Sequence, residues 1–89
     1  MSKMVITHSV VDVQNWLSFK AERAGAISSM GCSQVVDYVA EDGSNAVAIT
    51  ANVDDVASVL ATISSPPPDL GAAMQEHGVI PPLTVYVEG

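Results

Sequence analysis

The middle of the chain contains a predicted β-hairpin, and this hairpin limits the possible folds more than any other feature. Two stretches rich in β-branched and aromatic residues, 33–41 and 46–53, are separated only by the segment Asp42-Gly43-Ser44-Asn45. These residue types favour the backbone conformations of tight turns, so the two stretches are expected to pair as antiparallel neighbours. The rest of the chain must therefore pack around a sheet that already has two adjacent strands.

The segment before the hairpin predicts a strand followed by a helix. Residues 4–11 are rich in β-branched side chains and predict the first strand. Asp12 then stands where a helix N-cap belongs, because its carboxylate can accept hydrogen bonds from the free amides of the first turn. Gly31 is expected to end the helix. The stripe of the predicted helix that faces the core consists of Val13, Trp16, Leu17, Lys20, Ala21 and Ala24, with the methylene stem of Lys20 lying along it.

The segment after the hairpin predicts two helices and a last strand. Asp54 or Asp55 caps the first of these helices, and a run of three prolines stops it. A short helix follows over residues 68–76 and is closed by Gly78. Residues 83–87 predict the last strand, with a pair of prolines fixing its entry. The apolar stripe of the first of these helices consists of Val56, Val59, Leu60 and Ile63.

The order of these elements predicts an α+β fold. Two β-α-β halves around a central hairpin give the ferredoxin-like βαββαβ arrangement, with an extra short helix before the last strand. This arrangement has a four-stranded antiparallel sheet with helices on one face. The length of the chain fits a single domain over residues 1–89.

Alternation along the predicted strands separates the two faces of the sheet. The helix face is expected to bury Val47, Ile49, Val85 and Val87 almost completely, together with Ala51, Val53 and Leu83. The opposite face carries Ala46, Ala48, Thr50, Asn52, Thr84 and Tyr86. Such a face is too apolar to be exposed to water and too polar to form a dry core. We therefore expect a second sheet to cover it and to leave some hollow space between the two sheets.

Composition supports a covered face and excludes several classes of partner. Charged residues make up 15% of the chain, against roughly 25% in average soluble domains, which suggests that a second copy covers part of the surface. The formal net charge is −7, and three basic side chains cannot form the cationic patch that nucleic acids or anionic membranes require. The single Cys32 excludes an internal disulfide and supplies no metal cluster. No segment has membrane-spanning length, so the expected location is the cytoplasm.

Two motifs resemble those of a known superfamily. The stretch His8-x-Val10-x-Asp12-Val13-x-x-Trp16 is similar to the opening H-x-V-x-D-[FY]-x-x-W of many small dimeric α+β barrel proteins. A second stretch resembles their helix before the final strand, and it consists of Pro68-Asp69-Leu70-x-x-Ala73-Met74-x-x-x-Gly78-Val79. The superfamily includes antibiotic-biosynthesis-type monooxygenases, polyketide cyclases, chlorite dismutase relatives and stress-response barrels.

This resemblance implies an assembly and a binding site, but it does not select a reaction. It implies a homodimer in which two sheets pack against each other, and a cleft for a small molecule between the sheet and the helices of each subunit. The Asn, Trp and Tyr arrangement of the cofactor-free monooxygenases has no residue-by-residue match in this sequence, so no catalytic residue is carried over. Neither a cofactor nor a metal is expected.

Four side chains are candidates for ligand binding, and each has a purely structural alternative. His8 could act as a general base toward a ligand in a solvent-accessible cleft, or it could be a histidine at the edge of the core that bonds to a backbone carbonyl. Trp16 could be a ligand-stacking wall or part of the core. Tyr38 and Tyr86 could present hydroxyls to a ligand or dimer cavity, or they could bond to water or a partner subunit at the rim. His77, at the end of a helix, is expected to interact with the helix dipole.

Three hypotheses about function follow from these observations. The first is a homodimeric barrel that binds a small apolar or aromatic molecule in the cleft between sheet and helices. The second is a cofactor-free enzyme of the monooxygenase or cyclase type, with His8 as the base and Tyr86 or Trp16 shaping the pocket. The third is a structural or interaction dimer with no ligand. An open cleft beside His8 would favour the first two.

Overall fold

The computed structural model describes residues 2–88 and contains four strands and four helices. Among the described residues, no helix is both long enough and apolar enough to cross a membrane. The elements are β1 (Ser2–Val10), α1 (Val13–Ser18), α2 (Lys20–Ser28), β2 (Cys32–Val39), β3 (Ala46–Val53), α3 (Val56–Ser64), α4 (Pro68–Glu76) and β4 (Val79–Val87).

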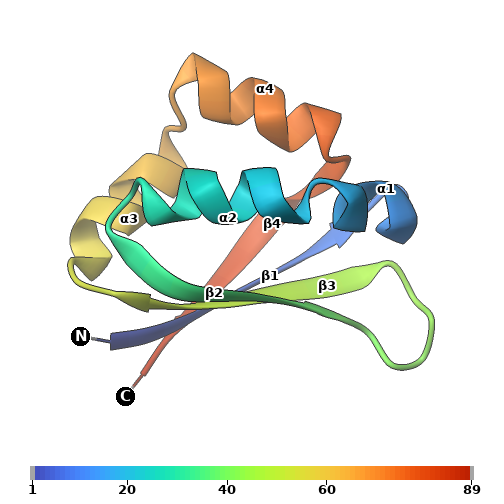
Figure 1. Cartoon of the computed structure of the whole chain (residues 1–89), viewed down its shortest axis with the longest axis horizontal. Helices are drawn as coiled ribbons and strands as arrows, with labels where there is room; N and C mark the ends of the chain where they lie inside the picture. Colours follow the sequence, from blue (N-terminus) through green and yellow to red (C-terminus); the bar gives the residue numbers. More distant parts are fainter. Residues whose placement is uncertain (1, 89) are drawn as a thin grey trace.

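The four strands form an antiparallel sheet in the order β2-β3-β1-β4. The helices all lie on one face of this sheet, and the other face is bare (Figure 1). The predicted hairpin joins β2 to β3, and β1 occupies the sheet centre between β3 and the edge strand β4. The predicted ferredoxin-like α+β fold is therefore confirmed, with the extra short helix α4 before the last strand.

Aspartates begin two of the helices, as the sequence predicts. Asp12 accepts hydrogen bonds from the backbone amides of Gln14 at 3.0 Å and Asn15 at 3.4 Å, so α1 starts where expected. For α3 the cap is Asp55, which accepts from the amide of Ser58 at 3.2 Å. Each carboxylate satisfies amides that have no partner within the first helical turn, and this fixes the point where the strand turns into the helix.

The first predicted helix is interrupted and becomes α1 and α2. Phe19 lies between them with backbone angles of φ −97° and ψ 14°. The buried side chains of α2 are Arg23 and Ile27, whereas Lys20 and Ala21 of the predicted stripe are exposed. The prediction is wrong for this half of the stripe because it followed apolar residues, while the guanidinium of Arg23 finds polar partners beneath the helix.

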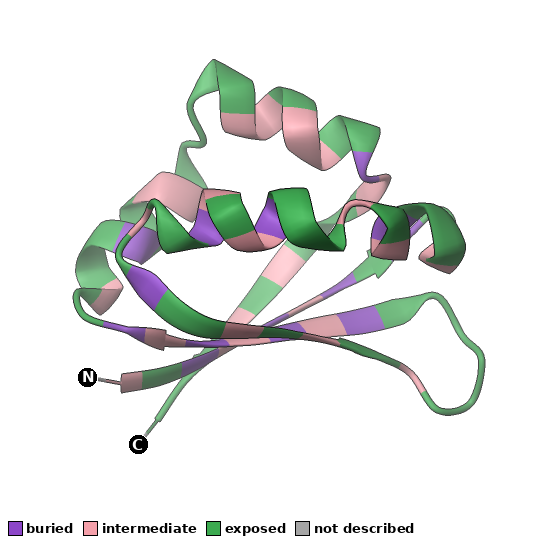
Figure 2. Cartoon of the chain, viewed as in Figure 1, coloured by how far each residue is buried: buried purple, intermediate pink, exposed green. Residues whose placement is uncertain are grey.

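The predicted burial on the helix face is confirmed for β3 and wrong for β4. Val47 and Ile49 are 4% and 6% exposed, but Val85 is half-buried and Val87 is 49% exposed. As an edge strand, β4 has a neighbouring strand on one side only, so its side chains are covered from fewer directions. Figure 2 shows buried residues along β1 and β3 and none along β4. Leu60 of the predicted α3 stripe is also exposed.

The sheet face away from the helices, called the open face, has the composition expected from alternation. Strand register places Tyr38 beside Ala48 and Tyr86 beside Val5 on this face. The strands present no acidic side chain to it, because Asp37 of β2 pairs with Ile49 on the helix face. The large apolar and aromatic residues that remain exposed on the open face are Val36, Tyr38, Ile80 and Tyr86.

The last strand begins at Val79, four residues earlier than predicted, and bulges away from β1. Thr7 pairs with Thr84, but Ser9 pairs with Ile80, so three residues of β4 lie opposite His8 alone. Two of these three residues are prolines, which have no amide to donate to the ladder and are tolerated on edge strands and at bulges. The bulge therefore opens the sheet next to His8.

Candidate functional site

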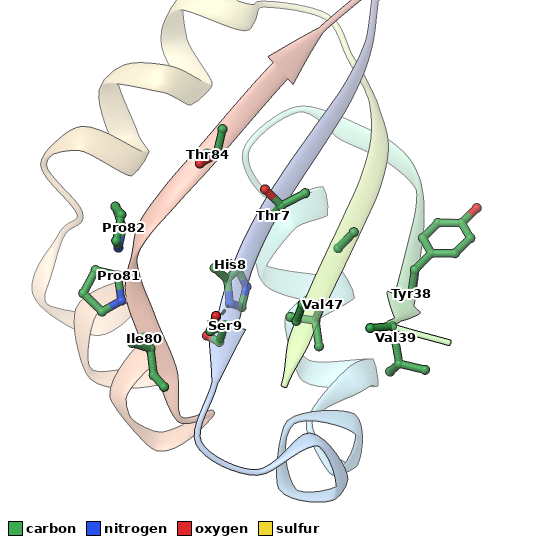
Figure 3. Close-up of a pocket in the computed structure, with 13 residues that line it drawn as sticks. Thr7, His8, Ser9, Tyr38, Val39, Val47, Ile80, Pro81, Pro82 and Thr84 are labelled. Atoms are coloured by element: carbon green, nitrogen blue, oxygen red, sulfur yellow. Dashed lines mark hydrogen bonds between the residues drawn. The ribbon is translucent and has the colours of Figure 1, made fainter. Parts of the chain in front are cut away.

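Two hollows lie on opposite faces of the sheet, and His8 borders both of them. The first, called the helix-side cavity, has a volume of about 90 Å³ and lies between the sheet and helices α2, α3 and α4. The second, called the open-face hollow, has a volume of about 500 Å³ and is open to solvent. Figure 3 shows this hollow between Pro81 and Pro82 of β4 and Tyr38 and Val39 of β2.

The walls of the helix-side cavity are mainly apolar. Apolar side chains come from β1, β3 and β4 below and from three helices above. Its polar side chains are His8, Arg23 and His77. Concave sites with apolar walls and a few polar groups are typical of small-molecule binding. The apolar side chains that α4 contributes are Leu70, Ala73 and Met74, and none of them is fully buried.

His8 is buried beside the β4 bulge, with 8% of its surface exposed. Its Nδ1 lies 3.0 Å from the carbonyl oxygen of Ser9, which accepts the hydrogen bond. Burial lowers the pKa of His8 below the ordinary histidine value, against the opposing effect of the bond to Ser9. The imidazole is therefore neutral near pH 7 and can act as a hydrogen-bond acceptor or a base through Nε2.

A buried ion pair forms the polar end of the cavity. The Nη2 of Arg23 lies 3.0 Å from Oδ2 of Asp37, and both side chains are more than nine-tenths buried. The Nη1 of the same guanidinium donates to the carbonyl oxygen of Trp16 at 3.0 Å and lies 3.4 Å from Nδ1 of His77. The carboxylate of Asp37 neutralises the positive charge of Arg23. The ion pair therefore links α2 to β2 and leaves no uncompensated charge on Arg23.

His77 ends α4 and lies within the same cluster. Its ring stacks on Phe19, with the ring centroids 4.4 Å apart and the planes inclined by 16°. Burial lowers the pKa of His77, and the positive charge of Arg23 adds to this effect. Its Nε2 is buried and has no hydrogen-bond partner among residues 2–88. The sequence assigned His77 to the helix dipole, whereas the structure places it in the cavity wall.

Trp16 lies in the core below this cluster and is 0% exposed. The guanidinium of Arg23 lies 3.9 Å from the centre of its ring, and His8 meets it edge-on at 6.1 Å. Trp16 borders neither hollow, so the structure gives it a packing position under the cavity rather than a place in its wall. Its indole packs against Arg23 and His8, two of the three polar residues that border the cavity.

Tyr38 and Tyr86 lie on the other side of the sheet from Trp16. They are 51% and 57% exposed on the open face, and Tyr38 borders the open-face hollow. The four predicted site residues are thus not brought together, since only His8 reaches both faces. Burial raises the pKa of the Cys32 thiol, which therefore stays protonated.

Sequence reasoning missed Arg23 and Asp37. Two signals in the sequence could have found them. Arg23 follows Trp16 by seven residues, which places both on one side of a helix. Asp37 lies two residues after Val35 on β2, so the two side chains share one face of the sheet. This is the face that meets the helices. Once α2 and β2 are known to pack together, these opposite charges predict an ion pair between them.

No family model and no curated protein matches the sequence. Several solved structures match it in fold. A candidate antibiotic biosynthesis monooxygenase from Deinococcus radiodurans is 17% identical with a TM-score of 0.61, and the match covers 100% of this chain and 93% of that one. The cofactor-independent oxygenase SnoaB from Streptomyces nogalater is 14% identical with a TM-score of 0.65, over 96% of this chain and 89% of that one. Rv0793 from Mycobacterium tuberculosis is 15% identical with a TM-score of 0.59, and the match covers 100% of this chain and 94% of that one.

This chain has the fold of the antibiotic biosynthesis monooxygenases. The resemblance to the dimeric α+β barrel superfamily, predicted from two short motifs, is confirmed at the level of the fold. The likeness in fold extends over nearly the whole length of both chains.

Proposed function

We propose that this protein binds a small, largely apolar molecule in the helix-side cavity. The observation that carries the proposal is a cavity between sheet and helices whose accessible walls are almost entirely apolar. An apolar ligand in such a cavity is stabilised because its own apolar surface and that of the walls leave water.

The packing of α4 supports the same proposal. Its inner side chains reach the cavity but remain half-buried, and Figure 1 shows this helix standing above the rest of the helical layer. The residues beneath α4 therefore do not fully cover the apolar inner surface of this helix. A ligand in the cavity would complete the burial of Leu70 and Met74, which is favourable because apolar surface leaves water.

Binding can be measured through methionine methyl groups, because Met4, Met30 and Met74 all border the cavity. Titration with 3-ethylphenol should shift these three signals in the NMR spectrum of the ¹³C-methyl-labelled protein. Ala73→Phe, which fills the cavity from α4, should weaken binding at least tenfold. Ala72→Phe is the matched control, because its side chain is exposed on the same helix. Shifts that are absent in the wild type, or equal in both variants, would contradict binding in this cavity.

We also propose that two copies pair through their open faces. This face carries exposed Val36, Tyr38 and Tyr86 and no acidic side chain on its strands. Two chains with a net charge of −7 can therefore approach there without direct repulsion between carboxylates. Exposed apolar patches usually mark contact sites, so these residues favour an interface on this face.

A cofactor-independent oxygenase is the second candidate function. Its support is the fold that this chain shares with SnoaB, together with the neutral imidazole of His8 at the cavity. A neutral base there could remove a proton from a phenolic ligand. Oxygen consumption should then rise when the protein is mixed with 1-naphthol, and His8→Gln should abolish the rise. Unchanged oxygen levels, with binding intact, would leave the protein as a binder.

A further inference from the structure

Strand register arranges the side chains of the open face in rows that run across the sheet. The first of three successive rows, called the ridge, consists of Tyr86, Val5, Thr50 and Val36. The next, called the middle row, consists of Thr84, Thr7, Ala48 and Tyr38. The third, called the hollow row, consists of Ile80, Ser9, Ala46 and Ala40.

The ridge and the hollow row differ in bulk. All ridge residues are aromatic or β-branched, and Tyr86 and Val36 are 57% and 42% exposed. In the hollow row every residue except Ile80 is an alanine or a serine, and the whole row borders the open-face hollow. No ridge residue borders this hollow. The open face therefore has a raised row and a depression on opposite sides of the middle row.

Two-fold symmetry decides how such a face meets a copy of itself. In a face-to-face pair the axis lies in the plane between the two sheets, and the contact must be self-complementary. An axis parallel to the strands would set ridge against ridge and hollow against hollow. An axis along the middle row, at the level of Thr7 and Thr84 in Figure 3, sets each ridge against the hollow row of the other copy. The second orientation gives the closer packing that stable interfaces show.

The charges at the two ends of the sheet favour the same axis. Lys3 precedes Thr7 by four residues and shares its face by alternation, and Ser44 of the hairpin turn precedes Ala48, also of the middle row, by four. An axis along the middle row therefore brings Lys3 of one copy to the hairpin turn of the other. That turn carries the exposed carboxylates of Glu41 and Asp42, whereas the ammonium of Lys3 forms no ion pair within residues 2–88. Opposite charges placed in this way fix the register of an interface.

We infer that two copies of this chain pair about a two-fold axis along the middle row, so that the ridge of each copy closes the open-face hollow of the other. This inference rests on the proposed pairing of open faces and adds its orientation. Thr50 of one copy then lies over Ala46 of the other, and Tyr86 lies over Ile80. The hollow beside His8 is thus completed by side chains from both copies.

Cross-linking between two single variants tests the orientation. Lys3→Cys and Ser44→Cys each add one exposed thiol to a chain whose own Cys32 is buried. The two variants are mixed in equal amounts, allowed to exchange subunits and treated with a short bismaleimide. We expect a covalent dimer that contains one chain of each kind, identified by its mass. Neither variant alone should give a covalent dimer, and the treated wild type is the control for Cys32.

A second variant tests whether the ridge enters the hollow. Ala46→Phe places a ring in the hollow row, so the partner's ridge meets an overfilled site and the dissociation constant of the dimer should rise about tenfold or more. Ala72→Phe, at an exposed position on α4, is the control and should leave this constant unchanged. Sedimentation velocity over a dilution series measures both, and circular dichroism checks that each variant is folded. The cross-linking result decides the matter if Ala46→Phe is not.

The outcomes separate this inference from the proposed pairing. Covalent dimers of either cysteine variant alone, or no mixed covalent dimer from a protein that sediments as a dimer, would overturn the orientation and leave the pairing. An unchanged dissociation constant in folded Ala46→Phe would show that the ridge does not close the hollow. A wild type that sediments as a monomer would overturn the pairing and the inference together.

Discussion

At the scale of single residues, Arg23 shows how strongly its surroundings decide a role. It is one of only three basic side chains in the chain, yet it is 6% exposed. Its guanidinium contacts the carboxylate of Asp37, the backbone of Trp16 and the ring of His77, which come from three different elements or their ends. Arg23 therefore links these elements to α2 and also contributes a charged group to the wall of the helix-side cavity.

Removing the carboxylate of this ion pair should destabilise the protein strongly. In Asp37→Ala the buried guanidinium loses its counter-charge, and breaking a buried pair in this way typically costs about 3–5 kcal/mol. Urea unfolding followed by circular dichroism should show a much lower midpoint. Glu41→Gln, at an exposed position, is the control and should leave the midpoint unchanged. Equal midpoints for Asp37→Ala and the wild type would mean that the pair is not buried in solution.

Stability should fall as the pH falls below about 6.5, the ordinary pKa of histidine. Both His8 and His77 have lowered pKa values in the folded protein, so the unfolded chain binds protons first as the solution is acidified. Proton uptake by the unfolded state favours unfolding, so the stability present above pH 6.5 is lost as the pH falls through the folded pKa values. Urea midpoints at pH 7.5 and 5.5 measure the loss, which should be smaller in His8→Gln. A midpoint that rises on acidification would contradict the neutral histidines.

At the scale of elements, the ends of the helices and strands are fixed by local chemistry. Asp12 begins α1, and Gly78 lets the chain leave α4 with a φ of +75°. The residues on either side of these points are held by long-range bonds: the amide of Val11 donates to the carbonyl oxygen of Gly78 at 2.9 Å. The end of α4 is thereby fastened to the start of α1, next to the cavity.

Replacing Gly78 should therefore cost more than replacing another glycine of the same conformation. A side chain at a left-handed position costs about 1–2 kcal/mol through backbone strain. In Gly78→Ala the new Cβ would also meet Cβ of Val11 at 3.4 Å, whereas in Gly43→Ala, at φ +80°, it would meet nothing within 4 Å. Thermal unfolding should give the lower midpoint for Gly78→Ala. Equal midpoints would show that Val11 moves aside freely.

At the scale of the whole molecule, helices cover one face of the sheet and leave the other face exposed. The helix face closes over a core that includes Met4, Val10 and Trp16, all almost fully buried. The open face keeps half-buried Thr7, Ala48 and Thr50 with large exposed side chains beside them. The open-face hollow would become an enclosed chamber if a second sheet covered it, and His8 would then border two chambers in each subunit.

A homodimer through the open face is expected at micromolar concentration, with a total buried area above about 1,200 Å² as stable pairs require. Sedimentation velocity should show a dimer for the wild type. Tyr86→Glu would place a carboxylate on the open face and should give a monomer. Val11→Lys is the matched control, because Val11 is 70% exposed and lies outside the open face. A wild-type monomer would refute the pairing.

Local sequence patterns were enough to predict the order of the strands, the hairpin, the cap at Asp12 and the fold class. These features depend on neighbours a few residues apart, as with the turn at Gly43 and the cap at Asp12, so local pattern is enough. Only the tertiary structure decided that Arg23 and Asp37 meet, that Val87 is uncovered on an edge strand, and that His77 joins His8 at one cavity. Such outcomes depend on which distant segments are brought together and from how many directions each side chain is covered, and no spacing along the chain encodes that directly.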